Sequence, residues 1–126
     1  MNPNSYLLTL GITPNYVGFS YAEYGILLAM EDPRRLTLLT KELYPLIADR
    51  FEVNWRSVER AIRTVVREAW THGNRALMEE ALHQTLLEPP DNGRFLGASA
   101  YYLKIRQEEA KKREEERAKR AQAAQV

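Results

Sequence analysis

Four arginines recur along one stretch of the sequence at the spacing of helical turns. They are Arg56, Arg60, Arg63 and Arg67. At about 100° per residue, all four fall within about 40° of Arg56, so a helix would present them as one stripe. The planar guanidinium group of arginine suits the edge of guanine and the oxygens of a phosphate. The spacing therefore favours nucleic-acid binding, although a charged face that meets only solvent has the same pattern.

The helix that would carry this stripe has clear ends. Asn54 is a suitable N-cap, and Gly73 ends the pattern after Thr71. The side opposite the arginines is apolar, as a surface that faces a core requires. Its residues are Val58, Ala61, Ile62, Val65 and Ala69. Glu59 lies beside the stripe, next to Arg60.

A second helical pattern comes directly before the first, at about residues 34–50. Pro45 lies inside this pattern, so it must begin, kink or split that helix. Only Phe51-Glu52-Val53 separates the two patterns. Two helices joined by a short turn, the second bearing the arginines, fit a helix-turn-helix.

The other apolar residues also recur at helical spacing, and no stretch alternates as a strand would. We expect an all-α, six-helix bundle-like domain that contains the helix-turn-helix. A first helix is expected at Ser5–Leu10, ending before Gly11, and a second from Ser20 to Glu31, where Ser20 and Glu23 have capping-box spacing and Asp32-Pro33 ends the helix. After the helix-turn-helix, a fifth helix is expected from residue 74 or 75 to Leu87. A sixth is expected from about Arg94, after a loop at 88–93.

Composition limits the classes of function. The 126 residues suffice for one domain, and the net charge of +1 excludes a strongly basic wrapper of nucleic acid but not a locally basic face. The absence of cysteine excludes disulfides and thiolate chemistry. No apolar run is long enough to cross a bilayer and no secretory signal is recognisable, so we expect a cytoplasmic protein that does not contact membranes.

The chain divides into two parts, an apolar-patterned domain at residues 1–106 and a charged tail at 107–126. Opposite charges stand four residues apart in the tail, as in Glu108–Lys112 and Glu109–Arg113, and would support a solvated helix. Because the tail has no apolar seam and cannot form a stable coiled coil, the pattern favours a frayed or partly disordered segment over such a helix. Its basic residues could add non-specific attraction to DNA phosphates.

Residues for catalysis or metal binding are scarce. His72, next to Gly73, suits the end of a helix, and His83 has no second ligand at metal-binding spacing. Carboxylate pairs such as Glu79-Glu80 are adjacent and lack a convergent partner. We therefore expect no catalytic residue, no metal and no cofactor, and no enzymatic activity.

Longer motifs point to a family. They are Leu-Tyr-Pro (43–45), Ile-Ala (47–48) and Phe51, followed by Val-Glu-Arg-Ala-Ile-Arg (58–63), Ala-Trp (69–70) and Gly-Asn (73–74). With Gly-Ile (11–12) and Gly18, they make Leu10 to about Arg106 resemble the C-terminal DNA-binding domain of stage-zero sporulation protein A, the response regulator of endospore-forming bacteria.

The resemblance implies a domain that places residues 54–71 as a recognition helix in the major groove of a short DNA box. The family's base-reading positions fall on Glu59, Arg60 and Arg63. Arg60 would donate two hydrogen bonds to guanine, and Glu59 would accept one from cytosine. Arg56 and Arg67 suit phosphates by helical geometry rather than by the family motif.

The chain also departs from the family. Its 126 residues leave no room for the receiver domain, so no phosphorylation switch within the chain is expected. Trp55 and Arg56 stand where related sequences often have small or polar residues, so Trp55 could be a core residue, a hydrophobic staple or an altered DNA contact. We expect Trp70 to pack rather than to stack on a base.

Protein partners are the alternative to DNA. By resemblance, about residues 74–87 would contact RNA polymerase, a sigma factor or a full-length regulator, either as an interaction module or as a competitor for regulator boxes. The final helix, about 94–106, would allow a homodimer on tandem sites. Its Tyr101, Tyr102, Leu103 and Ile105 are apolar enough for a core or an interface.

Overall fold

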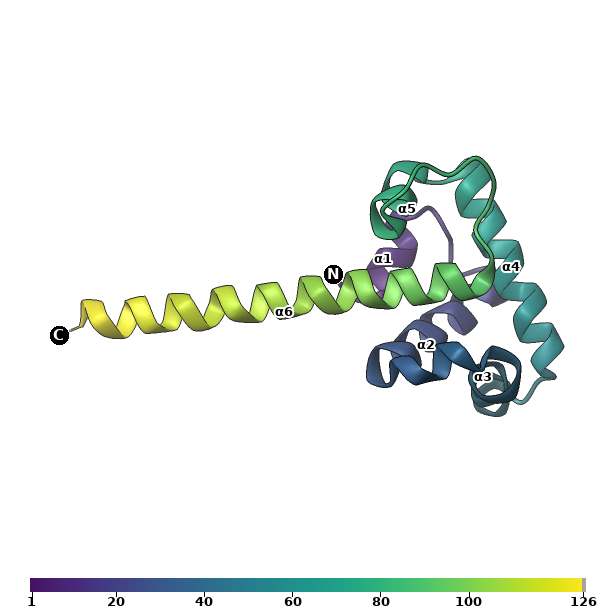
Figure 1. The fold of residues 1–126 in the computed structure, drawn as a ribbon, viewed down its shortest axis with the longest axis horizontal. Coiled ribbons are helices and arrows are strands. Elements are labelled where there is room, and N and C mark those ends of the chain that lie inside the picture. The colour runs from purple at the N-terminus through teal and green to yellow at the C-terminus, as the bar shows by residue number, and fades with distance from the viewer. Residues whose placement is uncertain (126) are drawn as a thin grey trace.

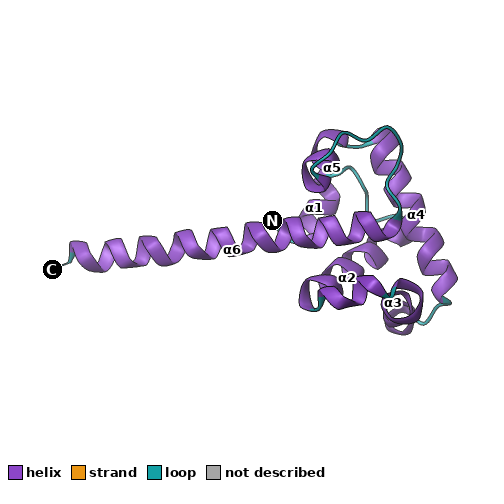
Figure 2. Ribbon diagram, viewed as in Figure 1, coloured by secondary structure: helices purple, strands orange, loops and turns teal. Residues whose placement is uncertain are grey.

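The computed structural model describes residues 1–125, and all regular secondary structure in this part of the chain is helical, with no strand (Figure 2). The six α-helices confirm the expected fold class. The elements are α1 (Pro3–Thr9), α2 (Val17–Glu31), the 3₁₀ turn η1 (Pro33–Thr37), the π-helical turn η2 (Leu39–Leu43), α3 (Tyr44–Phe51), α4 (Trp55–His72), α5 (Arg75–Leu82) and α6 (Asn92–Ala124).

The core forms where α2 packs against both α4 and α6 (Figure 1). A buried hydrogen bond adds α1 to this core, since the hydroxyl groups of Tyr6 and Ser99 lie 2.8 Å apart and both residues are fully buried. Burial raises the pKa of the Tyr6 phenol to about 12, so this hydroxyl group stays protonated and can donate. The first and last helices are thereby fixed to each other inside the domain.

The segment expected as one helix at 34–50 is instead three short elements, so that prediction was wrong. Leu38 leaves the helical region, with φ −133° and ψ 59°, and separates η1 from η2. Pro45 lies in the first turn of α3. Because proline has no N–H to donate to the preceding turn, the hydrogen bonding of the π-helical turn η2 ends here and that of α3 begins, while Leu43 and Tyr44 keep helical dihedral angles. Of the three outcomes that Pro45 allowed, it begins the helix.

Several predicted helix ends were also displaced. Ser20 does not cap α2, which begins three residues earlier with Tyr16 as an N-cap that makes no side-chain bond. Helix α5 ends at Leu82, not at Leu87, because His83 adopts the left-handed conformation with φ 55°. Helix α6 begins at Asn92 because Asp91 accepts a hydrogen bond from the backbone N–H of Arg94. The expected stop at Gly11 is present, with φ 94°.

Helix α6 passes from the core into solvent without a break. Its last buried residues are Tyr102 and Leu103, and from Arg106 to Gln125 every side chain is exposed. Of the four residues expected in a core or an interface, Tyr102 and Leu103 are therefore core residues, whereas Tyr101 is 63% exposed and Ile105 is half-buried. In Figure 1 the exposed part extends well beyond the rest of the domain. None of the described helices is long and apolar enough to cross a membrane.

Helices α2 and α4 approach each other closely at Gly18. A Cβ atom added to Gly18 would lie 2.2 Å from the carbonyl oxygen of Ala61 and 3.0 Å from Val65. These distances are far inside van der Waals contact, and one of the atoms is backbone. Only glycine therefore allows α2 to approach α4 this closely.

We expect Gly18→Ala to destabilise the domain by about 1–3 kcal/mol, because the added methyl group forces the two helices apart. Unfolding in urea, followed by circular dichroism, measures this change. Gly97→Ala is the matched control, since its Cβ would meet Leu36 at an ordinary 3.5 Å. Alanine at that helical position should stabilise the domain by up to about 1 kcal/mol. Equal stabilities for the two variants would contradict the close approach.

Candidate nucleic-acid interface

Helix α4 has the ends and the two faces that its sequence predicts. The side chain of Asn54 accepts a hydrogen bond of 2.8 Å from the backbone N–H of Arg56, and Gly73 follows the last helical residue. The buried residues are Val58, Ile62, Val65, Val66 and Ala69. Val66 was not expected among them, whereas Ala61 is only half-buried. The opposite face carries the arginines.

The turn between α3 and α4 is three residues long and closes the helix-turn-helix. Glu52 ends α3 in the left-handed conformation, with φ 56° and ψ 48°, and donates its backbone N–H to the carbonyl oxygen of Ala48. The backbone N–H of Val53 donates to the same oxygen at 3.0 Å. Both bonds satisfy the end of α3, so the chain can reverse into α4 within a few residues.

Trp55 occupies the first turn of α4 and packs back onto α3. Its ring stacks on Tyr44, with centroids 6.4 Å apart and planes inclined by 4°. The guanidinium group of Arg56 lies 5.3 Å from the centre of the Trp55 ring, within cation–π range. Trp55 is therefore a half-buried residue that packs between the two helices, and its ring contacts the guanidinium group of Arg56 at the beginning of α4.

The predicted site residues do not form one uniform stripe. Arg63 donates to the Glu59 carboxylate at 2.9 Å, one turn away on the same helix. This pair is partly exposed, so its two charges offset each other at the surface. Arg60 and Arg67 are exposed, and among the described residues their side chains make no hydrogen bond or ion pair. Both remain available to a ligand, as does Arg56, which lies over the Trp55 ring but makes no ion pair among the described residues.

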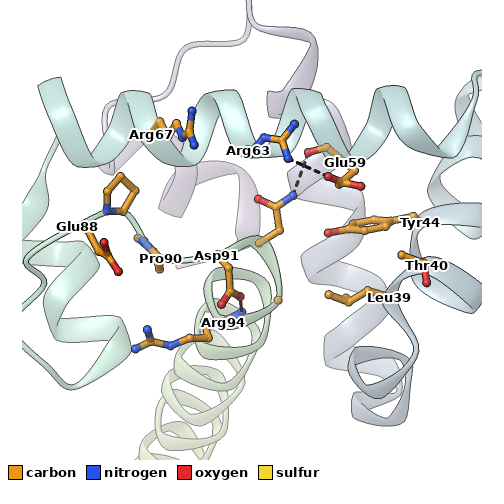
Figure 3. A pocket seen from close by; sticks show the side chains of 13 residues that line it. Leu39, Thr40, Tyr44, Glu59, Arg63, Arg67, Glu88, Pro90, Asp91 and Arg94 are labelled. Atoms are coloured by element: carbon orange, nitrogen blue, oxygen red, sulfur yellow. Dashed lines mark hydrogen bonds and ion pairs between the residues drawn. The ribbon is translucent and has the colours of Figure 1, made fainter.

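An open groove runs along one side of α4 (Figure 3). Glu59, Arg63 and Arg67 line it from α4, while Arg60 lies on the other side of the stripe, in a hollow beside Gly18 and Thr64. The opposite wall and floor come from Leu39, Thr40 and Tyr44 and from the segment Glu88–Arg94. The structure therefore brings together three of the five predicted residues in the groove, whereas Arg60 lines the hollow on the other side and Arg56 lies over the Trp55 ring.

Asn92 connects the groove to α6. It is only 8% exposed, and its Nδ2 donates to the backbone carbonyl oxygen of Glu59 at 2.9 Å. Burial raises the pKa of the Tyr44 phenol in the same groove above its ordinary value, which keeps that hydroxyl group neutral. The beginning of α6 is thus bonded directly to the turn of α4 that carries the predicted base-reading residues.

Two groove residues, Asn92 and Arg94, were missed by the sequence analysis. Both lie in Pro-Pro-Asp-Asn-Gly-Arg (89–94), which the sequence indicates as a loop running into a helix. The signal that could have been used is Asp91, because an aspartate N-cap begins the helix before Gly93. Nothing local indicates that this helix begins beside α4.

The far end of α4 is structural. Trp70 packs against the core, as expected, and the guanidinium group of Arg75 lies 4.0 Å from the centre of its ring. Nδ1 of His72 lies 3.2 Å from a Glu68 carboxylate oxygen. Residues 1–125 contain no group of three or more histidine, aspartate or glutamate side chains placed to hold a metal ion.

One comparison with known proteins matches this architecture. The family model described as the C-terminal domain of sporulation initiation factor Spo0A matches residues 4–103, which is most of the chain and includes the helix-turn-helix and the groove. The match ends in α6, just where its buried face ends. The family is one of helical DNA-binding domains of sporulation control and is not enzymatic. The chain belongs to the Spo0A C-terminal domain family.

Proposed function

We propose that the protein is a sequence-specific transcription regulator that places α4 in the major groove of DNA. The observation that carries this proposal is the exposed arginine face on the second helix of a helix-turn-helix, where Arg60 and Arg67 make no ion pair among the described residues. An α-helix fits the major groove, where each base pair presents a distinct pattern of donors and acceptors. The family match supports DNA binding in general, and the positions of the side chains on α4 support the choice of bases.

Arg60, Glu59 and Arg63 are the proposed base-reading residues. The unpaired guanidinium group of Arg60 is free to donate to O6 and N7 of a guanine. The Glu59–Arg63 ion pair holds both side chains on the exposed side of α4 before DNA arrives. Glu59 can then accept from cytosine N4 while Arg63 turns to a neighbouring base or phosphate.

Arg56 and Arg67 are the proposed phosphate contacts at the two ends of the reading face. They lie three turns apart on α4, and the guanidinium group of Arg56 makes a cation–π contact with the Trp55 ring. Contacts of this kind position a protein on the duplex without reading sequence. They should therefore determine the salt dependence of binding rather than its selectivity.

Selection of bound duplexes from a random pool tests the function directly. We expect the parent protein to recover one short motif, and recovery of the motif in tandem would indicate that two copies bind side by side. Arg60→Ala should cost about 1–3 kcal/mol on the selected site and lose selectivity at one base pair. Arg34→Ala is the matched control, since this arginine lies outside α4 and its side chain is 90% exposed.

Two outcomes would contradict the proposal. If the parent protein enriched no motif at modest salt but captured RNA polymerase or a sigma factor, the interaction-module alternative would be favoured. If the parent enriched a motif and Arg60→Ala kept the same preference, the DNA-binding function would stand and the role of Arg60 would be wrong.

We expect Glu59→Gln to bind random duplex more tightly than the parent, because it removes a carboxylate from the face that meets phosphates and releases Arg63. The same change should remove about 1–3 kcal/mol of discrimination at the base pair that Glu59 reads. Competition assays with single-base variants of the selected site measure both effects. Glu68→Gln, which removes the carboxylate beside His72 near the end of the same helix, should alter neither.

Arg67→Ala should weaken binding to all duplexes by a similar factor. Each lost phosphate contact lowers the slope of log affinity against log salt concentration by about 0.9. Titrations at several salt concentrations, on selected and random duplexes, measure this slope. A parental slope in the variant would remove Arg67 from the phosphate contacts.

A further inference from the structure

Arg94 stands in the first turn of α6, on the far side of the groove from α4 (Figure 3). Its backbone N–H donates to the Asp91 cap at 2.8 Å. Its side chain is exposed, and within residues 1–125 it makes no hydrogen bond or ion pair. The guanidinium group is therefore available to a ligand, although neither the family motif nor the arginine spacing of α4 predicts it as a site residue.

Arg67 faces the same groove from α4 and is equally unpaired. The other groove arginine, Arg63, already has Glu59 as its partner. Of the acidic residues along the opposite wall, Asp91 accepts the backbone N–H of Arg94, and Glu88 is exposed. Two separate helices thus direct unpaired arginines at one open groove, which is an arrangement suited to an anion.

The spacing of these two arginines is fixed by the core. The Asn92–Glu59 hydrogen bond joins the first residue of α6 to α4, and the next residues of α6, Phe95 and Leu96, are fully buried. Arg67 in turn follows the buried Val65 and Val66 on α4. Both guanidinium groups therefore project from rigid helices, so little further ordering of the backbone is needed to bind a ligand.

We propose that Arg94 and Arg67 together hold one phosphate of the DNA backbone, which makes the beginning of α6 part of the DNA interface. This inference rests on the proposed function. A duplex seated on Glu59 and Arg63 brings a sugar–phosphate strand to the edge of the groove that these residues line. Arginine is suited to this contact, because its planar fork can donate two hydrogen bonds to a phosphate. The phosphate lies beside the bases that α4 reads and carries no sequence information.

The test uses the full chain and a duplex that contains the selected site. Arg94→Ala should weaken binding about two- to tenfold, which is the range expected between the loss of an exposed ion pair and the loss of a hydrogen bond to a charged group. It should also lower the slope of log affinity against log salt concentration by about 0.9. Arg94→Lys should restore the slope and only part of the affinity. Glu88→Gln should tighten binding, since it removes the acidic side chain from the same groove. Thermal unfolding by circular dichroism confirms that each variant is folded.

Neutral methylphosphonate linkages, placed singly along both strands, locate the phosphate. In the parent, neutralising the phosphate shared by Arg94 and Arg67 should weaken binding, as should neutralising the phosphate that Arg56 contacts. In Arg94→Ala and in Arg67→Ala, only the substitution at the shared phosphate should weaken binding less than it does in the parent. If folded Arg94→Ala kept parental affinity and slope, or if every substitution weakened the variant as it weakens the parent, this inference would be overturned. The proposed function would still stand as long as the parent selects a motif.

Discussion

The burial of one side of α4 against α2 determines which charges of this domain can meet another molecule. Gly18 lets α2 approach until its backbone is against the Ala61 carbonyl group, and Val58, Ile62 and Val65 are fully buried on the same side. Because the arginines lie on the side of α4 opposite these buried residues, this packing leaves them facing outward. The same packing orients α3, whose Tyr44 stacks on Trp55, so the helix-turn-helix and the core are stabilised by shared contacts.

Net charge describes this surface poorly. The chain carries a formal charge of +1, yet some of its cations have a partner within the protein and others do not. Arg63 is offset by Glu59, Arg56 is stacked on Trp55, and Arg106 is bonded to Glu80, whereas Arg60, Arg67 and Arg94 are without partners among the described residues. Affinity for phosphates depends on these unpaired cations and on where they lie, Arg67 and Arg94 at the groove and Arg60 on the other side of α4, and not on the sum over the chain.

Local signals determined what the sequence could predict. Helix α4 was predicted correctly because an asparagine cap, a glycine stop and an apolar stripe all lie within its own residues. The prediction for 34–50 failed because apolar spacing does not reveal where Pro45 breaks the hydrogen-bonded turn. The groove was missed for another reason. Asn92 and Glu59 lie 33 positions apart, and only tertiary packing shows that the beginning of α6 meets α4.

The connection between packing and binding determines how variants of this domain must be interpreted. Arg60, Arg67 and Arg94 are exposed, so their removal should change binding with little effect on the free energy of unfolding. Asn92 is different, because it is buried and bonded to the α4 backbone. Its loss would change the position of α6 and the groove together, and weaker DNA binding by such a variant would not identify a contact. Only variants at exposed residues that keep the parental free energy of unfolding can separate an effect on DNA contacts from an effect on the fold.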